Sequence, residues 1–456
     1  PIFNNMITFL KNFIKYLLCI VVICLLFLKN IAYTKYIRDT EIENTLYAWT
    51  KPILRVAGLE ENNLKIHIVA DKRINAFVTN GQNMFLNTGL IIKAGSASGL
   101  IGVIAHEIGH IKAGHIVKMK QTARKLQDNQ FITSLLGMGL LIASTTSDNF
   151  KDDRMEIAQT ALSIGPSIAS KSFFSFSRSN EYVADTLAID FLKRVKRNPK
   201  SLSIILEKLY GQELLLIERQ DPFLRTHPLS KARMDLIKQK TSSADNYSES
   251  KFDKISYARI RAKLEGFLEN PGRTLLNNTD NSISSRYARA IAYFRAPQYK
   301  KSIEEINSLL KDYPDDPFFI ELKAQILSEN GKVKEAIKYY KESLKKIPNS
   351  TLIMLPLCSL LLEDSKNLKD IKEANTYLNF IVKKEPENIF AWHLKGISHN
   401  RLGQPIYANL SAAEEFLRRR DFRNAKFFAE KVISATKKFS SENLRASDII
   451  NLINEI

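Results

Sequence analysis

The sequence predicts an α+β, mostly helical protein in which a first domain with a small sheet precedes an all-α repeat domain. Strand-like runs cover residues 65–70, 75–81 and 84–89, and a helical pattern follows from Leu90. After residue 283 a helical pattern recurs about every 34 residues. The predicted boundaries are 33–240 for the first domain, 241–282 for a linker helix and 283–456 for the repeat domain.

Length and composition narrow the class of protein. The 456 residues are too many for one small domain, and 45% hydrophobic with 25% charged residues is typical of a globular chain. Global disorder, a collagen and a polytopic membrane protein are therefore excluded. The formal charge is +19. Because the sequence holds no basic stripe or known nucleic-acid module, we interpret the excess as a Lys-rich solvated surface without a nucleic-acid partner. An anionic membrane surface stays open as a peripheral contact.

Residues 1–32 resemble an export signal. Lys11 and Lys15 precede an apolar run at 16–28, and this run of 13 residues is shorter than the roughly 20 needed to span a bilayer. We expect a cleaved signal peptide. If residues 7–13 are counted in, a retained N-terminal anchor is the alternative. Outside this segment Cys358 is the one remaining cysteine, which excludes a disulfide framework and a cysteine-type zinc site.

The unit at 317–350 shows the repeat pattern most clearly. It has small residues where two antiparallel helices would cross closely, an aromatic residue to fill the groove beside them and a proline to end the second helix. This pattern resembles the tetratricopeptide repeat, and a generic stack of helical hairpins is the alternative. Such a stack presents a concave surface for extended segments or partner proteins. In the unit 317–350, the small residues are Ala324, Ala336 and Ser343, the aromatic residue is Tyr340 and the proline is Pro348.

The chemistry centres on the motif His106-Glu107-Ile108-Gly109-His110. On a helix, positions four apart share one face, so both imidazoles can bind one metal ion. Glu107 lies about 100° round the same helix and can accept a proton from water without being a ligand. An apolar run precedes the motif, which argues against a surface helix with incidental histidines.

A site with two histidines needs a third protein ligand. His115 follows His110 by five residues, about 140° round a continuous helix, so we interpret it as a supporting residue rather than a ligand. Glu181 and Asp185 are four apart and share a helix face. Glu181 is the better candidate ligand, with Asp185 orienting a ligand histidine. On spacing alone, a solvated acidic face explains this pair equally well.

His227 lies in the segment Thr226-His227-Pro228, ahead of a helical run. The proline restricts the backbone of the histidine before it. His227 could stabilise an oxyanion or occupy an open metal position, and an ordinary surface histidine is the alternative.

Four motifs in this order resemble the HtpX/BepA-type gluzincin metallopeptidases. They are INAFVTNGQNMFLNTGL at 74–90, HEIGH at 106–110 followed by His115, SRSNEYVAD at 177–185 and THPLSKAR at 226–233. The resemblance covers about residues 40–240 and implies a zincin-like metalloprotease domain. The downstream repeats are similar to those of the periplasmic, BepA-like members, although they are divergent.

The resemblance also implies the roles of single residues. His106, His110 and Glu181 would bind one Zn²⁺ per chain, with Glu107 as general base and His227 near the metal. Asp185 and His115 would support the ligands. The strand with Asn75, Ala76 and Phe77 would border the substrate cleft.

The expected function is a periplasmic zinc endopeptidase with polypeptide substrates. It would cleave misfolded or stalled envelope proteins in the quality control of outer-membrane protein assembly, with repeats that bind substrate or the assembly machinery. One alternative is a chaperone-like scaffold with an autoinhibited zinc site. The other is a protease anchored in the inner membrane.

Overall fold

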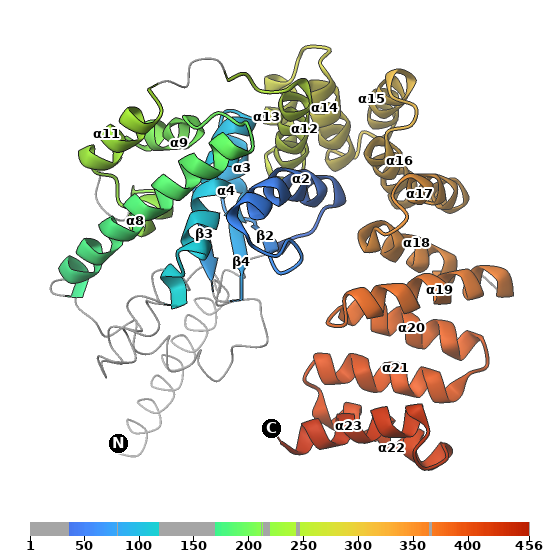
Figure 1. The fold of residues 1–456 in the computed structure, drawn as a ribbon. Helices are drawn as coiled ribbons and strands as arrows, with labels where there is room; N and C mark the ends of the chain where they lie inside the picture. The colour runs from blue at the N-terminus through green and yellow to red at the C-terminus, as the bar shows by residue number, and fades with distance from the viewer. Residues whose placement is uncertain are drawn as a thin grey trace, which may run out of the picture. The chain divides into compact units, whose positions relative to one another are not determined.

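The computed structural model describes residues 36–79, 81–117, 169–210, 212, 219–242, 247–363 and 367–455. The predicted export signal at 1–32 lies outside these residues. Among the helices within them, none has the length and apolarity required to cross a bilayer. The described residues group into two compact units, drawn from 1–37, 53–93 and 102–245 and from 38–52, 94–101 and 246–456. Figure 1 shows the sheet and the helices of both units.

A four-stranded sheet belongs to the first unit. It contains β1 (Tyr36–Ile37), β2 (Lys65–Val69), β3 (Ala76–Thr79) and β4 (Asn83–Asn87), in the order β1-β2-β4-β3. Strand β4 runs parallel to β2 and antiparallel to β3, so β3 lies at an edge. Phe77 and Phe85 stack with ring centroids 4.8 Å apart and join the two strands through their side chains.

The turn between β3 and β4 needs a left-handed backbone. Gly81 has φ +76°, a conformation that glycine adopts without steric cost. This turn closes a tight antiparallel hairpin and leaves β3 as the edge strand.

Helices cover the rest of the first unit. Two of them, α2 and α4, contribute residues to both units: 40–52 of α2 and 97–101 of α4 group with the second. The helices are α2 (Thr40–Ala57), α3 (Thr88–Lys93), α4 (Ala97–Lys112), α8 (Ala169–Arg194), α9 (Ser201–Leu209), α10 (Pro222–Thr226) and α11 (Lys231–Lys240).

The second unit is a succession of helix pairs. After α12 and α13, consecutive helices from α14 to α23 pack as hairpins (Figure 1). Their bounds are α12 (Lys251–Leu268), α13 (Pro271–Asn277), α14 (Ile283–Arg295), α15 (Tyr299–Asp312), α16 (Pro317–Glu329), α17 (Val333–Lys346), α18 (Thr351–Glu363), α19 (Leu368–Lys384), α20 (Ile389–Arg401), α21 (Pro405–Arg418), α22 (Phe422–Ala435) and α23 (Ser441–Asn454).

Small residues lie where the paired helices cross, as the sequence pattern predicts. The hydroxyl of Ser302 donates to the carbonyl of Ala290 at 2.7 Å, and that of Ser343 donates to the carbonyl of Pro317 at 2.8 Å. Both serines are fully buried. The predicted fold class, an α+β, mostly helical chain with a small sheet and an all-α repeat region, is confirmed.

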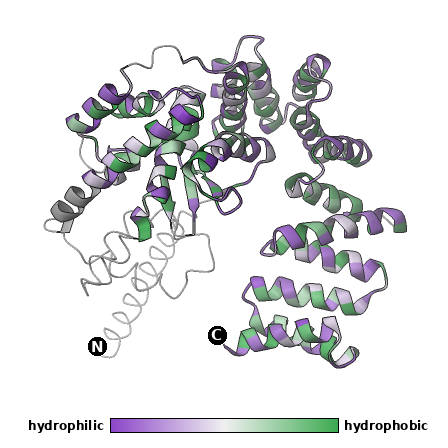
Figure 2. Cartoon of the chain, in the orientation of Figure 1, coloured by the Kyte–Doolittle hydropathy of each residue, from purple (hydrophilic) through white to green (hydrophobic). Residues whose placement is uncertain are grey.

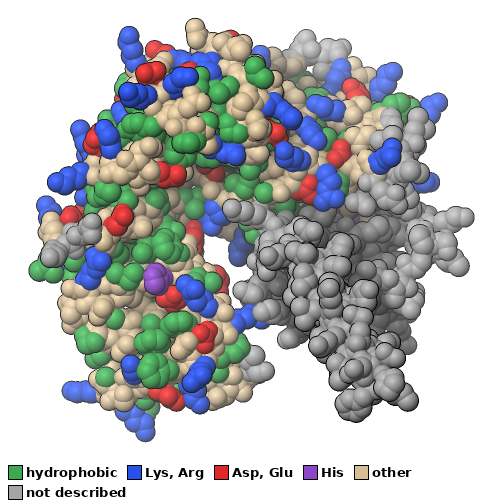
Figure 3. All heavy atoms as spheres, turned by 180° about the vertical axis from the view of Figure 1, so that it is seen from behind, with side chains coloured by type: hydrophobic (Ala, Val, Ile, Leu, Met, Phe, Trp, Pro, Cys, Tyr) green, Lys and Arg blue, Asp and Glu red, His purple; other side chains and the backbone are tan. Residues whose placement is uncertain are grey.

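The surface of the repeat helices is mixed in polarity. Most helices alternate hydrophilic and hydrophobic residues, whereas α18 is apolar over most of its length (Figure 2). Lys and Arg side chains are scattered over the face seen in Figure 3, with Asp and Glu between them. Such dispersed charge is typical of a solvated surface.

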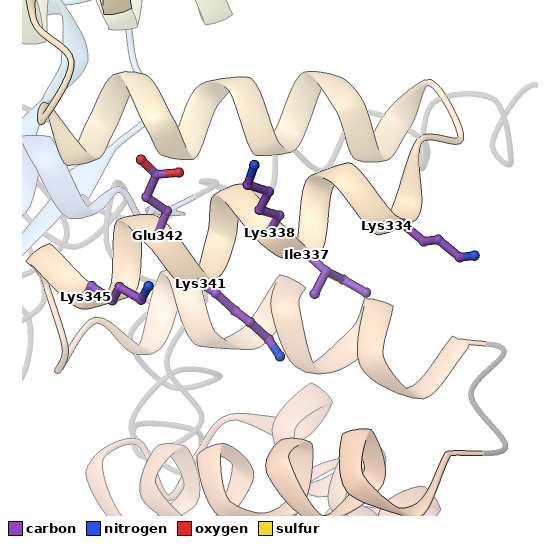
Figure 4. A pocket seen from close by; sticks show the side chains of 6 residues that line it. All are labelled: Lys334, Ile337, Lys338, Lys341, Glu342 and Lys345. Carbon is purple, nitrogen blue, oxygen red and sulfur yellow. The ribbon is translucent and has the colours of Figure 1, made fainter.

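A groove of about 540 Å³ lies beside α17 in the second unit (Figure 4). Lys338 and Glu342 point to one side of the helix and Lys341 to the other, where it lies 2.7 Å from Glu373 of α19. The groove therefore mixes ammonium groups with carboxylates. Its lining residues are Lys334, Ile337, Lys338, Lys341, Glu342 and Lys345.

Candidate metal centre

Helix α4 presents both histidines of the HEIGH motif to one buried point. His106 and His110 are 0% and 7% exposed, and their Nε2 atoms lie 3.0 Å apart. Burial follows from the apolar run before the motif, in which Val103 and Ile104 are fully buried. Two imidazole nitrogens this close to each other can bind the same metal ion.

Glu181 on α8 completes a group of three. Its Oε2 lies 3.1 Å from Nε2 of His106, and its Oε1 lies 3.2 Å from Nε2 of His110. The carboxylate is 3% exposed. The structure therefore brings the two histidines and the distant glutamate together.

A close approach of α4 and α8 makes this geometry possible. Gly109 lies between the two histidines in sequence, and a Cβ added there would come within 2.7 Å of the carbonyl oxygen of Ala184. Real Cβ atoms do not approach a backbone oxygen so closely. Only glycine allows the backbones to approach closely enough for Glu181 to contact the histidines.

His227 belongs to the same cluster. Its Nδ1 lies 3.2 Å from Nε2 of His106 and 3.2 Å from both oxygens of Glu181. Its Nε2 faces Oε1 of Glu107 at 3.3 Å. His227 follows the short helix α10, and Ser230 caps the next helix by accepting from the backbone N–H of Arg233. The imidazole thus bridges Glu107 on one side and His106 and Glu181 on the other.

The sequence reasoning missed Arg233. Its guanidinium donates to both oxygens of Asp185 at 2.6 and 3.0 Å, and it lies 3.0 Å from Glu181. It also donates to the backbone carbonyl of His227 at 3.2 Å. Asp185 in turn lies 2.9 Å from Nδ1 of His106. One buried guanidinium therefore contacts three separate parts of the site.

His115 reaches the site because α4 ends before it. The helix stops at Lys112, and Gly114 adopts φ +66° in the turn that follows. This turn brings Nδ1 of His115 to 2.9 Å from Nδ1 of His110. The contact fixes which nitrogen of His110 faces the cluster.

The predicted cleft residues lie at the edge of the sheet. Ala76 and Phe77 are in β3, and Asn75 precedes it, with Oδ1 buried and lacking a hydrogen-bond partner among the described residues. The neighbouring Ile74 donates its N–H to Asp221 at 2.8 Å, just before the helix that leads to His227. The edge strand is thus connected to the segment that carries His227.

The donor set fits a zinc ion. The ligand atoms of four residues lie within 4.8 Å of one another. The separations of 3.0 to 3.2 Å between donor atoms are close to the roughly 3.3 Å expected of ligands about 2.0 Å from a tetrahedral ion. Imidazole nitrogens and a carboxylate are the ligands that zinc prefers in catalytic sites. The four residues are His106, His110, Glu181 and His227.

Neighbouring charges and burial shift the pKa values of the clustered side chains. Burial favours a neutral Glu181, but His227 and Arg233 outweigh it and lower the pKa of the carboxyl well below its usual value. Burial lowers the pKa of His110, which favours the neutral imidazole. For His106 burial is outweighed by Glu181 and Asp185, which raise the pKa to about 9. The carboxylates thus concentrate negative potential at the cluster.

The fold and the cluster together have the features expected of a metallopeptidase domain with an HExxH motif. The chain matches Peptidase family M48 over residues 41–241. Every residue of the cluster lies inside this range, so the part of the chain that carries the cluster is similar to peptidase family M48.

Several curated proteins are similar to this chain. The beta-barrel assembly-enhancing protease of Yersinia pestis is 22% identical over 318 residues, which cover 68% of this chain and 63% of that protein. The protein of the same name from Escherichia coli is 24% identical over 341 residues, covering 72% and 65%. The mitochondrial metalloendopeptidase OMA1 of Schizosaccharomyces pombe is 24% identical over 206 residues, covering 44% and 55%.

The matches to the first two relatives therefore span slightly less than two thirds of those proteins. Among solved structures, a thermophilic TPR protein of Thermus thermophilus aligns with 40% of this chain and 98% of its own at 15% identity. The TM-score of this alignment is 0.24.

Proposed function

We propose that the chain is a zinc-dependent endopeptidase whose substrates are polypeptides. The observation that supports this most strongly is the buried cluster in which His106, His110 and Glu181 point their donor atoms at one another. In this role the three side chains hold the ion. Zinc supplies a Lewis acid and lowers the pKa of a bound water toward about 7.

Glu107 is the general base in this proposal. Its carboxylate is 1% exposed, and Oε1 faces Nε2 of His227 at 3.3 Å without forming a hydrogen bond. Once His227 moves aside, this carboxylate beside the ligand histidines can take a proton from the attacking water and return it to the leaving nitrogen.

His227 has a gating role in the proposal. Its Nδ1 is a fourth donor atom, while its Nε2 faces Glu107. With His227 in this position, the place next to Glu107 that water and substrate require is filled. Moving the side chain away opens that place, after which Nε2 can donate to a developing oxyanion.

Asn75, Ala76 and Phe77 border the substrate in this account. Strand β3 is at the edge of the sheet. An extended peptide can pair with such an edge through backbone hydrogen bonds.

The proposed substrates are misfolded or stalled envelope proteins in outer-membrane protein assembly. Two similar proteins are called beta-barrel assembly-enhancing proteases, which supports this choice. The export-like segment at 1–32 supports a periplasmic location. The repeats would bind the substrate or the assembly machinery, because paired helices stacked in succession offer an extended surface.

The arrangement of His227 also favours a second candidate, a chaperone-like scaffold whose zinc site is autoinhibited. In that case zinc-loaded protein would bind unfolded polypeptides and leave casein intact. Casein cleavage that disappears on chelation and returns with zinc would support the peptidase. Absence of cleavage in zinc-loaded protein would support the scaffold.

Exchange of Glu107 for Gln tests the base. The amide keeps the size of the side chain but cannot accept the proton, so casein cleavage should fall about 10²- to 10⁴-fold while zinc content stays at the wild-type level. Both are measured on the same preparation. A zinc-loaded Gln variant with wild-type activity would refute the role of Glu107.

A further inference from the structure

Within the second unit, the first residues of α2 are held by other helices through buried charges. Glu41 accepts a hydrogen bond from Arg259 of α12 at 2.6 Å and another from the hydroxyl of Tyr287 of α14 at 2.8 Å. Asp39, which precedes α2, lies 2.7 Å from Nζ of Lys263. The side chains of Glu41 and Lys263 are 4% and 6% exposed. Two carboxylates of one short segment thus bind two cations of α12.

Further contacts extend this attachment along the repeat helices. The hydroxyl of Thr40 lies 2.8 Å from that of Ser350, just before α18. Arg38 donates to Glu385 at 3.0 Å, just after α19. The segment Arg38–Glu41 therefore contacts several hairpins of the same unit, in the manner of a bound peptide.

The network around this segment contains more acid than base. Arg259 also makes a bidentate pair with Asp316 at the start of α16. One turn further along α16, Oε2 of Glu321 is buried and has no hydrogen-bond partner among the described residues. With all carboxylates ionised, four acids face two bases: Asp39, Glu41, Asp316 and Glu321 against Arg259 and Lys263. A buried carboxylate without full compensation is costly.

Glu321 is the group that can relieve this excess. Burial raises the pKa of its carboxyl, Lys263 opposes the rise, and Asp39 and Glu41 add to it, to a value of about 7. Tyr340 faces Glu321 from α17, and burial together with that carboxyl raises the pKa of the phenol, which stays neutral. Near neutral pH, the carboxyl of Glu321 therefore changes its charge.

We propose that Arg38–Glu41 is a latch within the second unit, closed on α12 and the repeat helices, and that a proton on Glu321 tightens it. With the latch open, the carboxyl would be hydrated and would regain its ordinary pKa of 4.5. The closed latch thus binds the proton more tightly than the open one. This contribution is fully present below pH 4.5 and is lost as the pH rises through about 7. The latch is loosest in mildly alkaline solution.

Hydrogen exchange in the full chain tests the latch. The readout is the exchange of the backbone amides at 42–50 in α2, measured at pH 6 and pH 8 and corrected for the intrinsic chemical rate. From pKa values of 4.5 and about 7, the equilibrium constant for opening should be about tenfold larger at pH 8 than at pH 6.

Two variants on the same helix sharpen the test. Glu321→Gln carries no charge at either pH, so it should keep the slow exchange at both. Glu329→Gln, at the exposed end of α16, should keep the wild-type response. Equal corrected rates at both pH values in the wild type would overturn the proposal. A tenfold change in corrected exchange between pH 6 and pH 8 in Glu321→Gln would also overturn the proposal.

Asp39→Asn gives an independent measurement should Glu321→Gln fold poorly. It removes one of the carboxylates that raise the pKa of Glu321, while the amide oxygen can still cap α2. The midpoint of the pH response should then move to lower pH. An unmoved midpoint would contradict the role of Glu321.

Discussion

Arg233 contacts Asp185, Glu181 and the backbone of His227 with one guanidinium group. Its side chain is 4% exposed. The sequence could not show this, because Lys231-Ala232-Arg233 has the composition of a solvated helix start. Burial of an arginine depends on carboxylates supplied by another helix, and that pairing is a tertiary contact.

We expect Arg233→Lys to weaken zinc binding about 10- to 100-fold, the range found when partners of metal ligands are changed. Lysine keeps the charge but cannot contact both oxygens of Asp185 while it donates to the carbonyl of His227. The measurement is zinc competition with a chelator of known affinity. Arg194→Lys on α8 is the control, since Arg194 is half exposed. Equal affinities in the two variants would show that Arg233 does not position the ligands.

The motif residues, by contrast, could be placed from the sequence. Spacing alone predicts that His106 and His110 share a helix face, because the helix period fixes it. Spacing alone did not decide whether Glu181 is a metal ligand, since an acidic pair at i and i+4 on a solvated helix face has the same sequence pattern. His115 depends on where α4 ends, and the turn at Gly114 brings it back to His110 against the angle of a continuous helix.

At the scale of elements, the site depends on how closely α4 approaches α8. Gly109 meets the backbone of Ala184, and on the same helix a Cβ at Gly102 would come within 2.5 Å of the backbone of Ser201. Glycines within a helix lower its stability, so their presence here reflects the crossings rather than the helix itself. Sequence indicated the helices, but only the structure shows which backbones touch.

Gly109→Ala should therefore separate the two helices. A methyl group at 2.7 Å from the carbonyl of Ala184 cannot be accommodated by a side-chain movement, so α8 has to shift and carry Glu181 away from the histidines. We expect lower zinc retention and a lower melting temperature. Gly396→Ala in α20 is the control, because its added Cβ would make ordinary contacts at 3.7 Å. Wild-type zinc content in Gly109→Ala would contradict this explanation of the crossing.

The strands and the repeat helices were the more predictable elements. Alternating runs before residue 90 correspond to β2, β3 and β4 within one or two residues. Ser302 and Ser343 stand at different places of their repeats, and each donates a hydrogen bond to a carbonyl of the preceding helix. These signals are local in sequence, which is why a single chain reveals them.

At the scale of the whole molecule, each compact unit is built from stretches that are separated in the sequence. Residues 38–52 and 94–101 belong with the second unit, although both precede the HEIGH motif in the chain. For residues 38–52 the reason is the set of long-range contacts at Glu41 and at Trp49, whose indole donates to Asp253 at 2.7 Å. Composition shifts along the chain contain no information about such contacts.

The most direct test of the account is the zinc content of the full chain and its Glu181→Ala variant after dialysis against a weak chelator. We predict one zinc per wild-type chain and well under one in the variant, because two imidazoles without the carboxylate hold the ion poorly. Asp190→Ala, at an exposed position of the same helix, should match the wild type. Equal zinc content in wild type and Glu181→Ala would contradict the assignment of the third ligand and with it the proposed peptidase site.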